Sequence, residues 1–301
     1  MKNLFKYPRL SLITLFVITS MLVWYQVFIF SSKGGGLLEV AFLNIGQGDA
    51  IFIETPNGNQ ILVDGGPGNN VIGELSKRMS FFDDSIDMIV VTNPDRDHIE
   101  GFLGVLKKFD VGLVVEPGTV TDTQVYKNLE KAIATEKNIN DVPAKKIIAR
   151  RGMDFLLDTD VHLFILFPDK DVSTFSTNDG SIVAKLVYKN TSIMLTGDAP
   201  EKTEKYLVAL ETGLSATSSA HLYSDILKVG HHGSKTSTSQ DFLQKVLPKY
   251  AVISAGKNNS YGHPSPEVTH RLKENKIQIF GTYDSGTIIF ESDGEGWFGR
   301  K

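Results

Sequence analysis

Two aspartates and a histidine stand close together at Asp95, Asp97 and His98, directly after the apolar segment at residues 87–91. The residues that follow have the apolar periodicity of a helix, so the three side chains lie in a predicted strand-to-helix turn. Carboxylates held this close raise one another's pKa, whereas a divalent cation keeps all its ligands deprotonated. The cluster therefore predicts a metal site. The simpler alternative is a surface turn whose aspartate caps the helix.

Three further polar groups occur in the same context, after apolar segments. Asp198 ends one such segment and begins a helical pattern, His231 and His232 follow another, and His263 follows a third after a short loop. Each group alone is typical of a helix cap or a polar loop. Open α/β sheets build their sites at the carboxyl ends of the strands, so the repetition favours one shared site.

Sheets are needed to bring these side chains together, and the hydrophobic pattern predicts two. Residues 39–45, 50–55 and 60–64 are short apolar segments separated by Gly-rich or Asn-Gly turns, as in a β-meander. Many strands with interleaved helices indicate an α/β (α+β) protein with two sheets sandwiched between helices. The further predicted strands are residues 87–92, 111–115, 162–167, 181–188, 192–196, 225–229, 251–254, 278–281 and 286–292, and the helices are residues 70–79, 99–108, 123–137, 201–210, 240–247 and 266–275.

The composition narrows the chemistry. The 301 residues include no cysteine, which excludes disulfides, zinc ribbons and thiol nucleophiles, so a metal must be held by His, Asp, Glu or Asn. The formal charge of the whole chain is −4. Residues 1–33 contain four basic and no acidic side chains, so the remainder carries −8. An acidic body argues against a protein whose main task is to grip duplex nucleic acid.

The N-terminal segment has the pattern of a membrane anchor. Residues 10–30 are uncharged and mostly apolar, and as a helix they would span about 31 Å, the thickness of a bilayer core. The pattern predicts a cytoplasmic basic tail at residues 1–9, a single transmembrane helix at 10–30 in the cell membrane, a linker at 31–36 and an extracytoplasmic domain at 37–301. A cleaved signal peptide is the alternative, although its apolar region is normally only about 7–15 residues long.

Several motifs together resemble the metallo-β-lactamase superfamily, and within it the hydrolase domain of ComEC-type DNA-uptake (competence) proteins. They occur in the family's order and span about residues 38–292. The resemblance implies a four-layer αββα sandwich with a metal site along one edge of the two sheets. The motifs are Asn44-Ile45-Gly46-Gln47-Gly48-Asp49-Ala50, Val63-Asp64-Gly65-Gly66, Asp95-Arg96-Asp97-His98, Val114-Val115-Glu116-Pro117-Gly118, Gly197-Asp198, Gly230-His231-His232-Gly233-Ser234 and Gly262-His263-Pro264-Ser265-Pro266-Glu267.

The resemblance also assigns metal ligands by position. Asp97 and His98 fill the places that serve the second metal, Asp198 corresponds to the bridging carboxylate, and His231 corresponds to the late histidine of the same metal. His232 and the later His263 are then candidates for orienting the substrate or protonating a leaving group.

The first metal position departs from the family pattern. Asn93 stands where a histidine is expected, and Asp95 replaces the second histidine, as it does in ComEC-type domains. The third-motif histidine is also absent, because residues 177–181 offer only Asn, Asp and hydroxyl groups. We therefore expect one tightly held divalent ion, or two of unequal affinity. Oxygen ligands shift the preference from Zn²⁺ toward harder ions such as Mn²⁺.

The substrate class rests on the resemblance, which implies cleavage of phosphodiester bonds in single-stranded DNA outside the membrane, next to a DNA-uptake machinery. The lysines near the late motifs offer a local basic surface: Lys228, Lys235, Lys257 and Lys273. The alternative is a degenerate, non-catalytic membrane-tethered module that binds nucleic acid or a partner, and Asn93 is the residue that supports it. The oligomeric state is left open.

Overall fold

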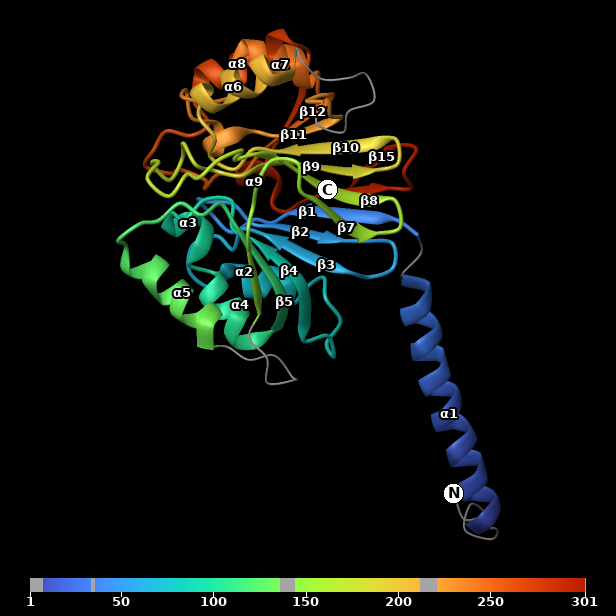
Figure 1. Ribbon diagram of the computed structural model, residues 1–301. Helices are drawn as coiled ribbons and strands as arrows, with labels where there is room; N and C mark the ends of the chain where they lie inside the picture. The colour runs from blue at the N-terminus through green and yellow to red at the C-terminus, as the bar shows by residue number, and fades with distance from the viewer. Residues whose placement is uncertain (1–7, 34–35, 136–143, 212–220, 301) are drawn as a thin grey trace.

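Two β-sheets face each other at the centre of the computed structural model, which describes residues 8–33, 36–135, 144–211 and 221–300 (Figure 1). The first sheet has the order β15-β14-β1-β2-β3-β4-β5-β6 and the second the order β13-β12-β11-β10-β9-β8-β7. The strands of the first sheet are β1 (Leu38–Phe42), β2 (Ile51–Glu54), β3 (Gln60–Val63), β4 (Ser85–Val90), β5 (Asp110–Glu116), β6 (Lys145–Ile148), β14 (Ile288–Ser292) and β15 (Trp297–Arg300). Those of the second are β7 (Asp154–Asp158), β8 (Val161–Phe167), β9 (Val183–Tyr188), β10 (Thr191–Leu195), β11 (Ile226–Lys228), β12 (Tyr250–Ile253) and β13 (Gln278–Gly281).

Helices cover the outer face of each sheet, so the fold has the predicted four layers (Figure 1). The first sheet is covered by α2 (Asn70–Leu75), α4 (Phe102–Lys108) and α5 (Gln124–Thr135), and the second by α6 (Glu201–Glu211), α7 (Gln240–Val246) and α8 (Pro266–Glu274). Apolar side chains of both sheets meet in a shared core, where Phe42, Ile53 and Leu163 are fully buried. Each such side chain stabilises the fold by about 1.5–3 kcal/mol relative to exposure.

Strand direction decides where the polar loops meet. The meander is confirmed, since β14, β1, β2 and β3 pair antiparallel, and β3 then pairs in parallel with β4. In the second sheet β10, β11 and β12 are parallel. The carboxyl ends of these parallel strands therefore lie along one edge of each sheet. The short helices α3 (Arg96–Ile99), α9 (Thr282–Ser285) and the 3-10 turn η2 (Gly230–Gly233) lie in the loops between the strands.

Three strands were not predicted from the sequence, and all three lie at sheet edges. These are β6, β7 and β15. The residues of β6 and β7 are exposed or half-buried throughout, so they lack the alternation of a strand with one buried face. An edge strand is held by one ladder of backbone hydrogen bonds, which the side-chain pattern does not reveal.

The prediction of a transmembrane helix at residues 10–30 is not supported. Pro8–Lys33 form one helix, α1, which extends away from the sheets (Figure 1). Of the helices in the described part of the chain, none is both long and apolar enough to cross a membrane. Residues 1–7 of the predicted basic tail and 34–35 of the predicted linker lie outside the described residues.

Candidate metal centre

Loops at the carboxyl ends of three strands place histidines and aspartates in one cluster. Asp97 and His98 lie in α3 after β4, Asp198 follows β10, and His232 lies in η2 after β11. Ligand atoms of Asp97, His98 and His232 lie within 4.8 Å of one another, as do those of Asp49, His98 and Asp198. The convergence that the strand ends predicted is therefore present.

His98 is completely buried and held from both sides. Its Nδ1 lies 2.8 Å from Asp64 Oδ2, and its Nε2 lies 3.2 Å from Asp198 Oδ2. Asp64 is itself fixed, because it accepts hydrogen bonds from the backbone N–H and the hydroxyl of Thr92 at 2.8 and 2.6 Å. A carboxylate on Nδ1 fixes the proton there and leaves Nε2 as the free ligand atom.

His232, rather than His231, joins Asp97 and His98. Its Nε2 lies 3.3 Å from Asp97 Oδ2 and 3.7 Å from Asp198 Oδ1. Both histidines have left-handed backbone angles, with φ of 47° and 55°, which is strained for residues with a side chain. This tight turn directs adjacent side chains differently, so His232 is buried while His231 is partly exposed. The resemblance assigned His231 to the metal and His232 to the substrate, whereas the ligand group among the described residues contains His232.

His231 and His263 lie at the rim of the cluster. His231 Nε2 is 3.8 Å from Asp198 Oδ2, and its ring contacts the His263 ring at a centroid distance of 5.6 Å. The Nδ1 atom of His263 is buried without a hydrogen-bond partner in the described part of the chain. Both side chains are thus placed to touch a substrate that enters the cluster.

Asp49 and Lys228 form a buried ion pair behind the cluster that the sequence reading did not identify as part of the site. Lys228 Nζ lies 2.7 Å from Asp49 Oδ2, and both side chains are almost fully buried. Asp49 Oδ1 is also 3.4 Å from His232 Nδ1. The position of Asp49 in the turn after the predicted strand at residues 39–45 could have indicated that it belongs to the site. Gly48 is required beside it, because a Cβ there would lie 2.2 Å from the backbone oxygen of Asp97.

The charges of the cluster are strongly coupled. Burial disfavours the imidazolium of His98, but the carboxylates of Asp198 and Asp64 outweigh it and raise the pKa of His98 well above 6.5. Burial is likewise outweighed at His232, whose pKa is raised to about 10 by Asp198 and Asp49. In turn, the pKa of the Asp198 carboxyl lies well below its usual range, because His98 and His232 outweigh its burial. When no cation is bound, His98 and His232 are therefore protonated, and their positive charges balance the carboxylates.

The residues fit a divalent cation. Among the described residues, four buried atoms of the cluster have ion-pair contacts at 3.2 to 3.7 Å but no hydrogen bond: His98 Nε2, His232 Nε2, Asp198 Oδ1 and Asp49 Oδ1. Buried polar atoms are normally satisfied, so such a group indicates a missing partner. Imidazole nitrogens and carboxylate oxygens are the ligands that Zn²⁺ and Mn²⁺ accept.

Asn93 and Asp95, the predicted first metal position, are instead hydrogen bonded to their neighbours. Asn93 is fully buried, its Nδ2 donates to Asn178 Oδ1 at 2.7 Å, and its Oδ1 accepts from the backbone N–H of Asp95 at 2.9 Å. Asp95 Oδ2 accepts from the Thr177 hydroxyl at 2.9 Å. Burial raises the pKa of the Asp95 carboxyl. Asp95 belongs to neither of the two groups of His and Asp ligand atoms found among the described residues.

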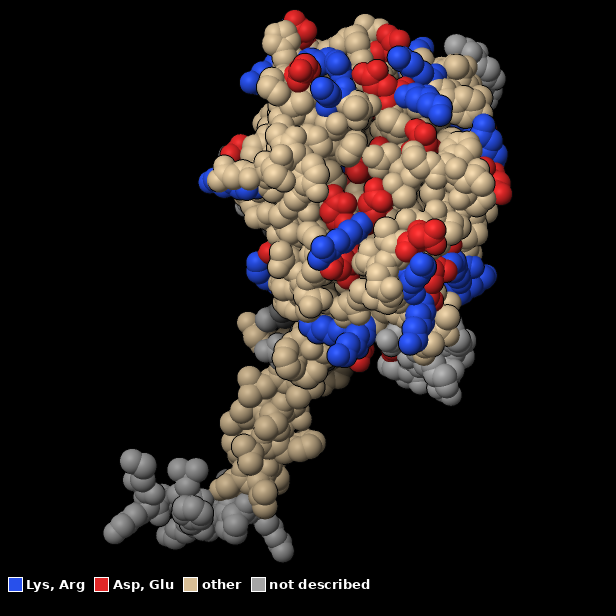
Figure 2. Space-filling model, turned by 90° about the vertical axis from the view of Figure 1, so that its left-hand side faces the viewer, with Lys and Arg blue, Asp and Glu red and all other residues tan. Residues whose placement is uncertain are grey.

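The basic surface expected from the late lysines is smaller than predicted. Lys228 is 1% exposed and occupied by Asp49, so it belongs to the interior, whereas Lys235, Lys257 and Lys273 are exposed. Figure 2 views the molecule from the side on which α3 lies in Figure 1. Acidic side chains gather at the middle of this face, with lysines and arginines around them.

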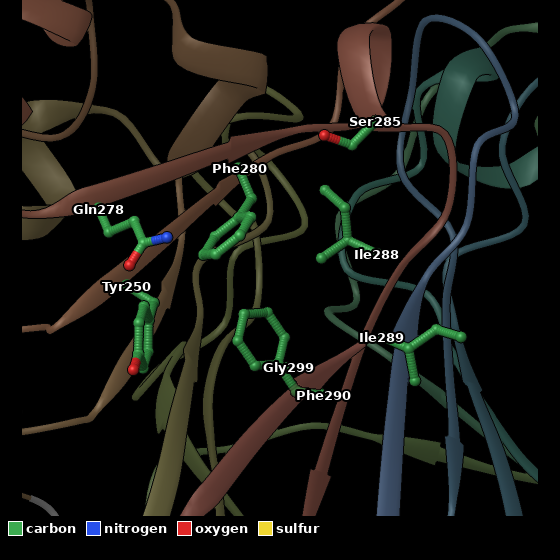
Figure 3. Close-up of a pocket in the computed structure, with 8 residues that line it drawn as sticks. All are labelled: Tyr250, Gln278, Phe280, Ser285, Ile288, Ile289, Phe290 and Gly299. Atoms are coloured by element: carbon green, nitrogen blue, oxygen red, sulfur yellow. The ribbon is translucent and has the colours of Figure 1, made fainter. Parts of the chain in front are cut away.

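A separate cavity of about 270 Å³ opens where the last strands of the two sheets meet (Figure 3). Three rings gather in it, those of Tyr250, Phe280 and Phe290, with centroid distances of 5.6 to 6.0 Å. None of the predicted site residues lines it. Its lining is Tyr250, Gln278, Phe280, Ser285, Ile288, Ile289, Phe290 and Gly299.

The layered fold and the cluster at its strand ends define a class. Residues 43–257 match the metallo-beta-lactamase superfamily, and the chain belongs to it. Among solved structures, the E377D mutant of the CmlA beta-hydroxylase shares the fold, with a TM-score of 0.54 and 10% identity, over 84% of this chain and 53% of that one.

Relatives by sequence include a protein named as a competence protein. The chain is 32% identical to ComE operon protein 3 of Bacillus subtilis, over 89% of this chain and 34% of that protein. It is 29% identical to Recombination protein 2 of Haemophilus influenzae, over 89% of this chain and 30% of that protein. It is 39% identical to competence protein ComA of Neisseria gonorrhoeae over 38% of this chain and 15% of that one. The chain thus spans about a third or less of each relative.

Proposed function

We propose that this chain is a metal-dependent hydrolase that cleaves phosphodiester bonds in single-stranded DNA. The observation that carries the proposal is the set of buried imidazole and carboxylate atoms without hydrogen-bond partners, which converge at the strand ends. The substrate is proposed from the similarity to competence proteins, and with it an association with a DNA-uptake machinery.

Four residues would hold the ion: Asp97, His98, Asp198 and His232. A divalent ion held there supplies a water nucleophile at neutral pH by lowering the pKa of water toward about 7. Asp64 keeps the proton of His98 on Nδ1. The buried pair of Asp49 and Lys228 supports His232 from behind. His231 and His263 at the rim would orient the phosphate, and their rings exclude water from one side.

One ion per chain is expected, as Zn²⁺ or Mn²⁺. Asn93 has a hydrogen bond at each amide atom, and Asp95 Oδ2 accepts one from Thr177, so a second ion at this position would compete with hydrogen bonds that are already made. The four charged or imidazole ligands of the other position are enough to hold one ion, which would need a further open position for the water that it activates.

The test is the Asp97→Ala variant, assayed with Mn²⁺ and with Zn²⁺ on a single-stranded oligodeoxynucleotide, with metal content measured on the same samples. We expect loss of hydrolysis and of bound metal. The variant should stay folded, because the Asp97 side chain is partly exposed and contributes little to the core. Asp122→Ala, which removes a fully exposed carboxylate, is the matched control and should change neither. Full activity in Asp97→Ala would overturn the assignment.

The alternative is a non-catalytic binding module. It is supported by the hydrogen bonds that Asn93 and Asp95 form with neighbouring side chains. Metal content separates the two proposals. A scaffold needs no stoichiometric divalent ion, so a purified chain that takes up no ion from Zn²⁺ or Mn²⁺ solutions would favour the module.

We further propose that α1 attaches the chain to a membrane, with the sheets on the outer side. The support is its row of exposed apolar side chains, which includes Phe16 at 73% and Trp24 at 72%, and the basic residues that precede it. Protease added to intact spheroplasts should degrade the domain. Full protection of the domain there would contradict this orientation.

A further inference from the structure

An exposed aromatic ring stands next to the candidate metal centre, on the loop between β12 and α8. Tyr261 is 70% exposed. Its ring stacks on His263 at a centroid distance of 5.9 Å and an interplanar angle of 24°, and His263 in turn contacts His231. The His231 ring lies 6.2 Å from that of His232. A continuous row of rings thus runs from solvent to the cluster.

The loop that carries Tyr261 is held by one side chain. Asn259 Oδ1 accepts from the backbone N–H groups of Tyr261 and His263, both at 3.1 Å, and its Nδ2 donates to the carbonyl oxygens of Gly256 and His263 at 2.9 and 2.5 Å. Gly256 N–H donates to Gln47 Oε1 at 3.1 Å, which ties the loop to the first sheet. The backbone on both sides of the exposed ring is therefore fixed before any ligand arrives, which lowers the entropic cost of binding.

Two exposed lysines lie on the loops at the strand ends. Lys257 is exposed on the same loop as Tyr261, and Lys235 is exposed two residues after η2. An aromatic ring with lysines beside it is how proteins bind single-stranded nucleic acid, because the ring stacks on a base and the lysines contact the backbone phosphates.

We propose that Tyr261 is a base-stacking residue that binds a nucleobase of a single-stranded nucleic acid next to the scissile phosphate. The inference rests on the proposed function and deepens it, since it names the part of the substrate that is recognised. It makes the site selective for unpaired bases, because a base inside a duplex stack does not present its face to the ring.

The experiment compares the affinity of two labelled ligands for the full chain loaded with Mn²⁺. One is an oligothymidylate with hydrolysis-resistant phosphorothioate linkages, and the other is an abasic oligomer of the same length and linkage. Fluorescence anisotropy gives the Kd of each. Tyr261→Ala should weaken binding of the oligothymidylate about 5- to 150-fold, the range expected for the loss of one stacked base. It should leave the Kd of the abasic oligomer unchanged.

Three controls sharpen the result. Tyr261→Phe keeps the ring and should bind both oligomers as the parent chain does. Tyr223→Ala removes another exposed tyrosine, near the amino end of β11, and should also leave both affinities unchanged. Lys257→Gln removes a cation and should weaken both oligomers alike. A ribose version of the oligomer tests RNA against DNA, and stacking predicts the same effect of Tyr261→Ala for both.

Equal affinity of Tyr261→Ala and the parent chain for the oligothymidylate would overturn the proposal, as would an equal loss for both oligomers. These results are independent of the proposed hydrolysis. If no variant, nor the parent chain, cleaves an ordinary oligonucleotide, the proposed function fails while the Kd ratio still decides the role of Tyr261.

Discussion

The two halves of the candidate site differ in how their polar atoms are satisfied. Around His98, His232 and Asp198, buried ligand atoms of the described chain lack hydrogen-bond partners, and the charges shift one another's pKa strongly. In the other half, which precedes Asp97 and His98 in the same loop, the side chains of Asn93 and Asp95 form hydrogen bonds with Asn178 and Thr177. The half whose buried ligand atoms make no hydrogen bonds favours a bound cation. The half whose polar atoms are hydrogen bonded to neighbouring side chains does not require one.

This difference shows what replacing histidine by asparagine does in such a site. A neutral imidazole with one orienting partner leaves its second nitrogen available for a metal. An amide offers an acceptor and a donor side by side, and Asn93 has both engaged. The asparagine at this position therefore forms a hydrogen-bonded connection between the loop after β4 and the loop before β9.

The largest effect is expected from breaking the half that lacks partners. Asp198→Asn removes a carboxylate that faces three histidines and should reduce metal affinity and hydrolysis by more than about 100-fold, the upper cost of losing a group that only supports a ligand. Asp95→Asn in the other half should cost less than about 10-fold. Metal titration and kcat/KM of the two variants check the ratio. Equal losses would remove the distinction between the halves.

The buried ion pair behind His232 should carry the next largest effect. Lys228→Met leaves Asp49 buried without its cation, and we expect a loss of about 3–5 kcal/mol in the free energy of unfolding, measured by urea denaturation. Lys185→Met is the matched control. Lys185 is also buried, but its Nζ donates to the carbonyl oxygen of His221 and burial lowers its pKa, so its removal should cost much less. A Lys228→Met variant as stable as the parent chain would contradict the pairing.

The pH dependence of stability tests the electrostatics of the half that lacks partners. In the metal-free chain the pKa of His232 is raised from 6.5 to about 10, so the protonated form stabilises the fold. That stability is fully present below about pH 6.5 and is lost as the pH rises toward 10. The Tm with EDTA should therefore fall between pH 6.5 and 10. A bound ion replaces the protons, so the Tm with Zn²⁺ should fall less, and parallel curves would argue against ion binding there.

The smallest effect is expected where histidine is restored. Asn93→His removes the hydrogen bonds to Asn178 and to the Asp95 backbone, and offers one imidazole without an established partner. Metal stoichiometry at saturation should move from one ion toward two, with at most a modest change in activity. Metal analysis across a titration measures this. Stoichiometry that stays at one would show that the bonded half excludes a second ion even with a histidine.

The meander, the interleaved helices and the strand-end position of the site could be predicted, because each depends on local patterns. Apolar segments such as that of β4 mark buried strands, and the polar residues directly after them must lie at the sheet edge. The edge strands β6, β7 and β15 could not, since backbone pairing rather than side-chain burial holds them. The transmembrane prediction relied on one uncharged run, and the structure does not support it.

By itself the sequence determined the αββα sandwich and the group of aspartates and histidines that meet at one edge. Both follow from local patterns, because the spacing of apolar residues predicts the strands and the residues at which they end. Only the tertiary structure decided which histidine of the adjacent pair turns inward, through the left-handed backbone of η2. It also decided that Lys228 faces Asp49 rather than solvent, and that Tyr261 is held beside His263. Such pairings join segments far apart in the chain. Their distances depend on how the two sheets are packed, which no local pattern encodes.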